Sequence, residues 1–209
     1  MQKRRRTFIA INLPADVKKR LARFQGKWAD VPAKWTPAEN LHITVLFLGD
    51  LTEQDLAVAC QAVKEVAKNH SSFNITLDKI AYGPEGKTGA LNSLSARPST
   101  IHGALVPPRY IWAGGGEVEE LSALKKDLEQ ALFEAIKFKM DKVAFTVHIT
   151  LARIKEWEWR QIEPEERPEV NEAIELIFTA ESIDVMESEL KRGSPQYTII
   201  ESHQLYYLL

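Results

Sequence analysis

The sequence predicts an α+β fold in which a duplicated β-α-β unit builds two antiparallel sheets that face a central cleft, with helices on the outside. The first observation behind this prediction is that His-Ile-Thr occurs twice, in LHITVLFLG (41–49) and VHITLARI (147–154), each time within a strand-like pattern. The second is that the surroundings of both strings repeat in the same order: strand, helix, His-Ile-Thr strand, further strand. Two such copies imply pseudo-two-fold symmetry within one chain.

The first copy begins with FIAI (8–11), a short apolar run that predicts a buried strand. A helical pattern follows, and its apolar face consists of Val17, Leu21 and Phe24. After the His-Ile-Thr strand, Thr52 and Asp55 form a capping box and predict the start of a second helix. Cys60 falls on the apolar face of that helix, so we interpret it as a core residue. The strand-like FNITLDKI (73–80) closes the copy.

The second copy begins with YIWA (110–113), a predicted buried strand in which Trp112 is expected to belong to the core. A longer helix follows, with Val118, Leu121, Leu124, Leu128 and Leu132 at helical spacing. FTAESIDVM (178–186) predicts the closing strand of this copy. The acidic stretch before it, residues 156–176, contains two prolines and is interpreted mainly as a solvated loop.

The two copies predict a single bilobal domain over residues 1–209. Lobe one covers about residues 1–85 and lobe two about residues 109–209. The connecting loop, residues 83–108, is rich in Gly, Pro and Ser, and a loop of this length is often functional, so it is a candidate to close over the cleft. Because the inferred symmetry is internal, no second chain is needed to complete a site, and we expect a monomer.

Composition excludes several classes of protein. With 209 residues and 44% hydrophobic side chains, the chain can bury a sizeable core. We expect neither a membrane helix nor a signal peptide, since no apolar run approaches the roughly 20 residues that span a bilayer. One cysteine cannot form an intramolecular disulfide, which favours a cytoplasmic location. The net charge of −2 argues against coating of nucleic acid through bulk charge, so any such substrate must be held locally, for example by the basic start at residues 3–6.

Alternation along a strand gives each His-Ile-Thr string an open face and an apolar face. In the first string His42 and Thr44 share the open face, while Leu41, Ile43, Val45 and Phe47 are expected to face the helices. In the second string, His148 and Thr150 share the open face in the same way. One His-x-Thr string is weak evidence, because single copies arise by chance. Two copies at matching places in a duplicated unit indicate a functional pair.

Two imidazoles and two hydroxyls that converge across a cleft suit an in-line displacement at a phosphodiester. One imidazole can activate the nucleophile while the other protonates the leaving group, and the hydroxyls can hold two non-bridging oxygens. Arg153 would not share the face of His148 in a regular strand, but a β-bulge near the strand end would turn its guanidinium toward phosphate. Trp35 is a candidate for stacking on a base at the rim of the cleft.

Two other classes of function compete with this interpretation. A nucleotide- or RNA-end-binding module could use the same residues without turnover. A metal site would need more ligands than each strand offers, since each supplies one imidazole with no partner ligand at the second or fourth residue beyond it. We therefore expect no metal and no cofactor.

The chain resembles the bacterial and archaeal RNA 2′,3′-cyclic phosphodiesterases, also called 2′-5′ RNA ligases, of the two-histidine (2H) phosphoesterase superfamily. The resemblance covers nearly the whole chain. The similar segments, in order, are RRTFIAINLP (5–14), ENLHITVLFLGDL (39–51), PRYIWAG (108–114), HITLARI (148–154) and ESELKRGSPQYTII (187–200). Their order and spacing together make the resemblance specific.

The resemblance implies that RNA ends or cyclic nucleotides are the substrate and that hydrolysis leaves a 2′-phosphate, without metal or ATP. It implies that His42 is the proton donor to the leaving 3′ oxygen and that His148 is the proton acceptor that activates water. Thr44, Thr150 and Arg153 would bind the phosphate. The reverse reaction, with a 5′-hydroxyl in place of water, would be 2′-5′ ligation. Two departures from the family are Val147, where many relatives have proline, and a longer connecting loop.

Overall fold

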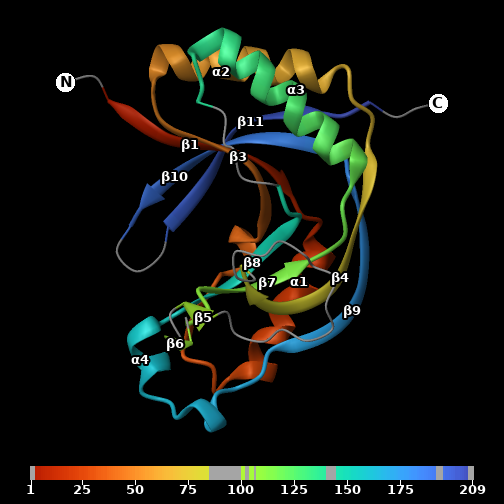
Figure 1. Cartoon of the computed structure of the whole chain (residues 1–209). Helices are drawn as coiled ribbons and strands as arrows, with labels where there is room; N and C mark the ends of the chain where they lie inside the picture. The colour runs from red at the N-terminus through yellow and green to blue at the C-terminus, as the bar shows by residue number, and fades with distance from the viewer. Residues whose placement is uncertain are drawn as a thin grey trace.

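A computed structural model describes residues 3–84, 100–101, 104–105, 107–139, 145–191 and 195–206 (Figure 1). The α-helices of the described residues are α1 (Ala15–Arg23), α2 (Glu53–Ala67), α3 (Glu119–Ile136) and the short α4 (Glu156–Arg160). The 3-10 turns are η1 (Phe24–Trp28), η2 (Ala38–Asn40) and η3 (Pro164–Glu166). Within these described residues, no helix is long and apolar enough to cross a membrane.

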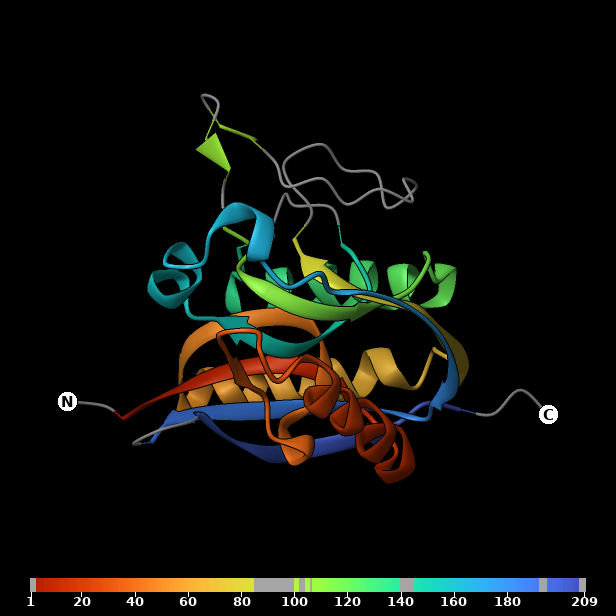
Figure 2. The ribbon, with the colours of Figure 1, turned by 90° about the horizontal axis from the view of Figure 1, so that it is seen from below.

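Two antiparallel sheets form the body of the fold. The four-stranded sheet has the order β11 (Pro195–Gln204), β10 (Ser182–Leu190), β1 (Arg4–Asn12), β3 (His42–Thr52). The five-stranded sheet has the order β2 (Ala33–Trp35), β8 (His148–Ile154), β7 (Tyr110–Gly114), β4 (Phe73–Gly83), β9 (Asn171–Ala180). Strands β3 and β8 contact each other, and Figure 2 shows them between the rest of the two sheets. The predicted fold class is confirmed.

Each sheet takes strands from both sequence copies. The four-stranded sheet combines β1 and β3 from the first copy with β10 and β11 from the second, and the five-stranded sheet mixes them likewise. The sheets therefore do not correspond one to one with the two halves of the sequence, and the proposed lobe limits stay a prediction. Most of the connecting loop, residues 83–108, lies outside the described residues. Its closure over the cleft therefore stays a prediction. Within it, β5 (Thr100–Ile101) and β6 (Ala104–Leu105) pair with each other.

Helices α2 and α3 pack side by side on one side of the sheets (Figure 1). The predicted leucine face of α3 is confirmed, because Leu121, Leu124, Leu128 and Leu132 are all fully buried. The predicted start of α2 is confirmed as well: the Thr52 hydroxyl accepts a hydrogen bond from the Asp55 backbone N–H at 3.1 Å. Cys60 is buried in the core, and burial together with the carboxylate of Glu201 raises the pKa of its thiol to about 11. It is a core thiol and not a nucleophile.

The prediction for residues 156–186 is wrong in two respects. Residues 171–176, expected in a loop, belong to strand β9, and the predicted closing strand 178–186 is two strands that meet at Glu181. Strand β9 pairs with β4 in the five-stranded sheet, whereas β10 pairs with β1 in the four-stranded sheet, so the chain changes sheets there. Strand β9 escaped prediction because it is an edge strand, where exposed charged residues interrupt the apolar pattern.

Candidate active site

The two predicted histidines stand at the start of neighbouring strands. His42 is the first residue of β3 and His148 the first residue of β8. Strands β3 and β8 contact each other, so the two imidazoles lie on adjacent strands. His148 is among the causes that lower the pKa of His42. Val147, where many relatives have proline, is buried. Strand β8 still begins at the histidine of its motif, as β3 does. The fold thus brings together the two motifs that lie in separate copies of the sequence.

Both imidazoles are held by a backbone carbonyl two residues upstream. The Nδ1 atom of His42 lies 2.7 Å from the carbonyl oxygen of Asn40, and Nδ1 of His148 lies 2.8 Å from that of Thr146. A carbonyl oxygen only accepts hydrogen bonds, so Nδ1 carries the proton in both rings. In the neutral form, Nε2 of each ring then carries a lone pair that can accept a hydrogen bond or a proton. The repeat therefore extends to the tautomer of the two histidines.

The two threonines occupy matching places beside the histidines, and both are half-buried. The hydroxyl oxygen of Thr44 lies 2.9 Å from Nε2 of His42. With the neutral imidazole accepting at Nε2, this hydroxyl is the donor. Thr150 pairs in register with Trp112 of β7, on the face that carries His148.

Burial sets the protonation of both imidazoles. It is the largest cause that lowers the pKa of His42, where the Asn40 carbonyl acts in the opposite direction and Lys18 and His148 lower the pKa further. Burial also lowers the pKa of His148, against the effect of the Thr146 carbonyl. Both pKa values fall below the ordinary 6.5. The free protein at neutral pH therefore holds two neutral imidazoles, each with a lone pair on Nε2.

A β-bulge follows each threonine. In the pairing of β8 with β7, Thr150 lies opposite Trp112 and Ala152 opposite Ile111, so Leu151 is an extra residue. Arg153, which pairs with Tyr110, is turned by the bulge onto the face of His148 and Thr150. A bulge near the strand end is the feature that the sequence required for this orientation.

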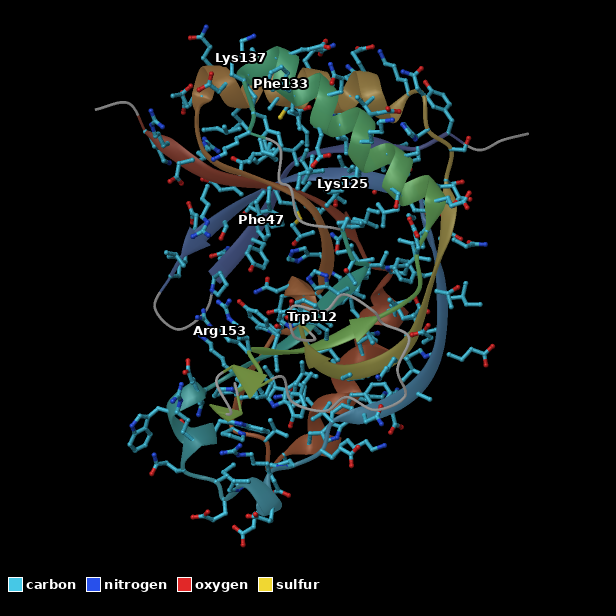
Figure 3. All side chains as sticks on the ribbon, in the orientation of Figure 1. Phe47, Trp112, Lys125, Phe133, Lys137 and Arg153 are labelled. Carbon is cyan, nitrogen blue, oxygen red and sulfur yellow. The ribbon has the colours of Figure 1, made fainter. Side chains whose placement is uncertain are left out.

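Strand β3 has the same irregularity one residue after Thr44. Ala10 lies opposite Thr44 and Ile9 opposite Leu46, so Val45 is the extra residue. The expectation that Phe47 faces the helices is therefore wrong: Phe47 lies opposite Phe8 on the face of Thr44, and it is 69% exposed. Phe47 and Arg153 hold the same position in their motifs, five residues after the histidine (Figure 3).

Trp112 does not belong to the core, contrary to the sequence prediction. Its indole stacks on the imidazole of His148, with ring centroids 4.0 Å apart and planes 26° apart. Its neighbours in β7, Ile111 and Ala113, are fully buried on the other face of the strand. Successive side chains on a strand point to opposite faces, so alternation along YIWA could have predicted that Trp112 faces away from Ile111 and Ala113.

Two aromatic side chains that the sequence analysis did not single out surround His42. Phe8 of β1 lies 5.0 Å from the imidazole between ring centroids, and Tyr197 of β11 lies 5.2 Å away in an edge-on arrangement. Burial raises the pKa of the Tyr197 phenol, with a smaller opposing effect of Arg6, so the phenol is neutral at physiological pH. Tyr197 is far from His42 in the sequence. It lies in the same sheet as His42 only because β11 pairs with β10, β10 with β1, and β1 with β3.

Comparison with known proteins places the chain in a family. The family model described as LigT-like phosphoesterase matches residues 11–90 and 116–197. The chain belongs to this family. An RNA 2′,3′-cyclic phosphodiesterase of Geobacillus stearothermophilus is 27% identical over 97% of this chain, which spans 58% of that protein's length. Another of Methanothermobacter thermautotrophicus is 26% identical, over 96% of this chain and 98% of that protein.

Solved structures agree with the family assignment. The TT0787 protein of Thermus thermophilus matches with a TM-score of 0.74 and 27% identity, over 97% of this chain and 98% of that chain. LigT of E. coli, complexed with 3′-AMP, matches with a TM-score of 0.71 over 97% of this chain and 99% of that chain. At 20% identity, that second likeness concerns the fold alone.

Trp35 of this LigT-like phosphoesterase does not share the face of β8 that carries His148 and Thr150. It lies in β2 opposite Ala152, on the buried face of β8, and it packs against the main core. Its remaining surface lines a hollow with Pro32, Lys155 and Glu158. Its stacking on a base stays a prediction. Among the described residues, no group of three or more His, Cys, Asp and Glu side chains is arranged to hold a metal ion.

Proposed function

We propose that this LigT-like phosphoesterase hydrolyses RNA 2′,3′-cyclic phosphate ends to 2′-phosphomonoesters by acid/base catalysis with its two His-x-Thr motifs. One observation carries the proposal: the two imidazoles start neighbouring strands, and the Nδ1 of each is held by a backbone carbonyl, so that Nε2 is the nitrogen left to take or give a proton. The curated relatives named as RNA 2′,3′-cyclic phosphodiesterases support the choice of substrate.

His148 acts as the base in this proposal. Its lowered pKa keeps Nε2 unprotonated at neutral pH, so that it can accept a proton from the attacking water. The water oxygen forms a bond to phosphorus while the bond from phosphorus to the 3′ oxygen breaks. The Thr146 carbonyl stabilises the imidazolium that forms, because it accepts a hydrogen bond from Nδ1.

His42 acts as the acid and gives its Nε2 proton to the leaving 3′ oxygen. A cyclic phosphodiester carries one negative charge, and an anion beside the ring favours the imidazolium form that the reaction needs. Once Nε2 is protonated, the Thr44 hydroxyl no longer donates to it and is free to donate to a phosphate oxygen. Proton exchange with solvent then restores both rings.

Thr44, Thr150 and Arg153 bind the non-bridging phosphate oxygens in this mechanism, which uses no metal ion and no ATP. Arg153 supplies a planar, permanently charged donor on the face of His148. Phe47, at the matching position of the first motif, offers an exposed aromatic surface for the nucleobase. The same groups would serve 2′-5′ ligation in reverse, with a 5′-hydroxyl in place of water. Because both motifs come from one chain, we also propose that the protein works as a monomer.

The test is incubation of the protein with a short RNA that ends in a 2′,3′-cyclic phosphate, in EDTA and without ATP. We expect a terminal 2′-phosphate with the wild type, and a loss of about 100- to 10,000-fold in rate with His42→Ala and with His148→Ala. Circular dichroism would check that both variants fold. Equal rates in wild type and variants would overturn the proposal, and tight binding with no product in any sample would support a binding module instead. Activity that EDTA abolishes and zinc or manganese restores would contradict metal independence.

A further inference from the structure

The carbonyl that orients His42 belongs to a short turn that is tied down from two sides. Turn η2 ends at Asn40, whose carbonyl oxygen accepts the hydrogen bond from Nδ1 of His42. The side-chain amide of Asn40 donates to the carbonyl of Pro195 in β11 at 3.0 Å. From the other side, the ammonium of Lys18 in α1 donates to the carbonyl of Glu39 at 2.8 Å. The orientation of His42 therefore depends on Lys18 through a single residue of backbone.

Lys18 is held in place by more than this hydrogen bond. The Lys18 side chain is half-buried, and burial lowers its pKa, while Glu39 and the carboxylate of Asp184 act in the opposite direction. Asp184 is itself 2% exposed and accepts a hydrogen bond from the Ser202 hydroxyl at 2.6 Å. Asp184 also interacts with Asn12, the residue opposite His42 in the pairing of β1 with β3. A buried anion thus balances the cation next to His42.

The second histidine lies beside a different cation. Burial lowers the pKa of His148, and the Thr146 carbonyl acts in the opposite direction. The cation on the face of His148 is Arg153 of β8, which the proposed mechanism uses to bind phosphate. Lys18 instead reaches the turn before His42 and contributes to lowering the pKa of that imidazole. The two halves of the site therefore share the carbonyl that orients the ring and differ in the element that holds their cation.

We propose that Lys18 is a positioning residue for His42, which holds the turn that orients the imidazole and adds a fixed positive charge beside it. The inference rests on the proposed role of His42 as proton donor. A neighbouring cation disfavours the charged imidazolium, so the protonated ring gives up its proton to the leaving oxygen more readily. The same charge would weaken a base, which agrees with the donor role proposed for His42.

The other groups around His42 do not provide this charge. Phe8 is uncharged, and the Tyr197 phenol stays neutral because its pKa is raised. Thr44 and Asn40 contribute hydrogen bonds only. His148 also lowers the pKa of His42, but it must be neutral to act as the base. Lys18 is thus the fixed charge that acts on the proposed acid.

Three substitutions separate the charge of Lys18 from its hydrogen bond. Lys18→Arg keeps both, Lys18→Gln keeps a donor for the Glu39 carbonyl without the charge, and Lys18→Met removes both. Lys19→Gln, at the exposed neighbouring position of α1, removes the same charge away from the site and is the matched control. The imidazole C2 protons of the five histidines are followed by NMR titration in the free protein, with His42 assigned by its loss in His42→Gln. The pH dependence of kcat/KM on the cyclic-phosphate RNA is measured in parallel.

We expect the pKa of His42 to rise in Lys18→Gln and Lys18→Met and to stay unchanged in Lys18→Arg and Lys19→Gln. The high-pH limb of kcat/KM moves to higher pH with it, because the donor must be protonated. In the pH range in which His42 is protonated in every variant, we expect kcat in Lys18→Gln to fall by up to about 10-fold, because a weaker acid gives up its proton less readily. A further loss in Lys18→Met measures the contribution of the hydrogen bond.

An unchanged His42 titration in Lys18→Gln and Lys18→Met would overturn the inference. So would equal falls of kcat in Lys18→Gln and Lys19→Gln, since the effect would then be general surface charge. The NMR titration needs no turnover, and it therefore distinguishes failure of this inference from failure of the proposed function. If Lys18→Met folds poorly, Lys18→Gln alone decides the role of the charge.

Discussion

The indole of Trp112 lies against the imidazole of His148 with ring centroids 4.0 Å apart. This stack, together with the hydrogen bond from Nδ1 to the Thr146 carbonyl, restrains both the plane of the ring and its rotation within that plane. A catalytic base needs such restraint, because a small displacement of the reacting nitrogen lowers the rate steeply. Trp112 thus supports His148 through packing, as the η2 turn supports His42 through a hydrogen bond.

Replacement of Trp112 is expected to lower kcat more than it changes KM. Trp112→Ala removes the surface that holds the imidazole, and we expect a loss of about 10- to 100-fold in kcat because His148 becomes mobile. Trp112→Phe keeps an aromatic face and should retain most of the activity. Steady-state kinetics on a cyclic-phosphate RNA would measure both. Equal losses in the two variants would show that the indole acts in some way other than stacking.

Gly83 leaves room for that indole. A Cβ atom at this position would overlap Cδ2 and Cε3 of Trp112. Gly83→Ala is therefore expected to displace the indole, to lower kcat in the same direction as Trp112→Ala, and to destabilise the fold by about 1–3 kcal/mol through overpacking. Thermal unfolding and kinetics would test this. Gly26→Ala is the control, since a Cβ there meets no atom within 4 Å.

Local patterns in the sequence predicted helices α1, α2 and α3 and the strands of the two His-Ile-Thr strings, whereas α4 lies where a loop was expected. The capping box at Thr52 and the leucine face of α3 were found where expected, because both depend on residues close together in the chain. Arg153 shows the limit of such reasoning. Its position five residues after His148 left its face undetermined, and only the pairing of β8 with β7 places the bulge at Leu151. The matching bulge at Val45 moved Phe47 to the opposite face from the one predicted.

The environment of His42 depended on contacts that no local pattern carries. Lys18 and Tyr197 lie in α1 and β11, at opposite ends of the chain. Only in the folded protein does Lys18 bind the turn before His42 and Tyr197 pack against its ring. The exchange of strands between the two sheets has the same origin, because the partner of an edge strand is chosen by the whole fold. The pairing of the two His-Ile-Thr strings could thus be predicted from the repeated motif, whereas the surroundings of His42 could not.

Arg153 is expected to act through the geometry of its guanidinium as well as its charge. Arg153→Lys keeps the charge but loses the planar fork, and we expect it to recover only part of the loss seen in Arg153→Ala, which should cost about 1.5–3 kcal/mol in kcat/KM. Kinetics on the cyclic-phosphate RNA would compare the two. Arg160→Ala, on the exposed face of α4, is the control. Wild-type kcat/KM in Arg153→Ala would exclude a role in phosphate binding.

Phe47 is expected to contribute to substrate binding and not to the chemical step. Phe47→Ala should raise KM for a cyclic-phosphate RNA by a factor that corresponds to about 1–3 kcal/mol, the range for base stacking on an aromatic side chain. The change in kcat should be small, since Phe47 touches neither histidine in the ring contacts of the described chain. Phe133→Ala, another exposed phenylalanine on α3, is the matched control. A fall in kcat with unchanged KM would contradict a role in binding.

The two histidines are also expected to make stability depend on pH. Burial lowers the pKa of both below the ordinary 6.5, so between the folded and unfolded values the unfolded chain binds protons that the folded protein does not. The free energy of unfolding must then rise with pH through this window, and the penalty for burying the rings is full below both folded values. Replacing both rings by glutamine removes this term. We therefore expect the melting temperature of His42→Gln/His148→Gln to vary less than that of the wild type between about pH 5 and 7. Parallel slopes for the two proteins would mean that the imidazoles are not desolvated in solution.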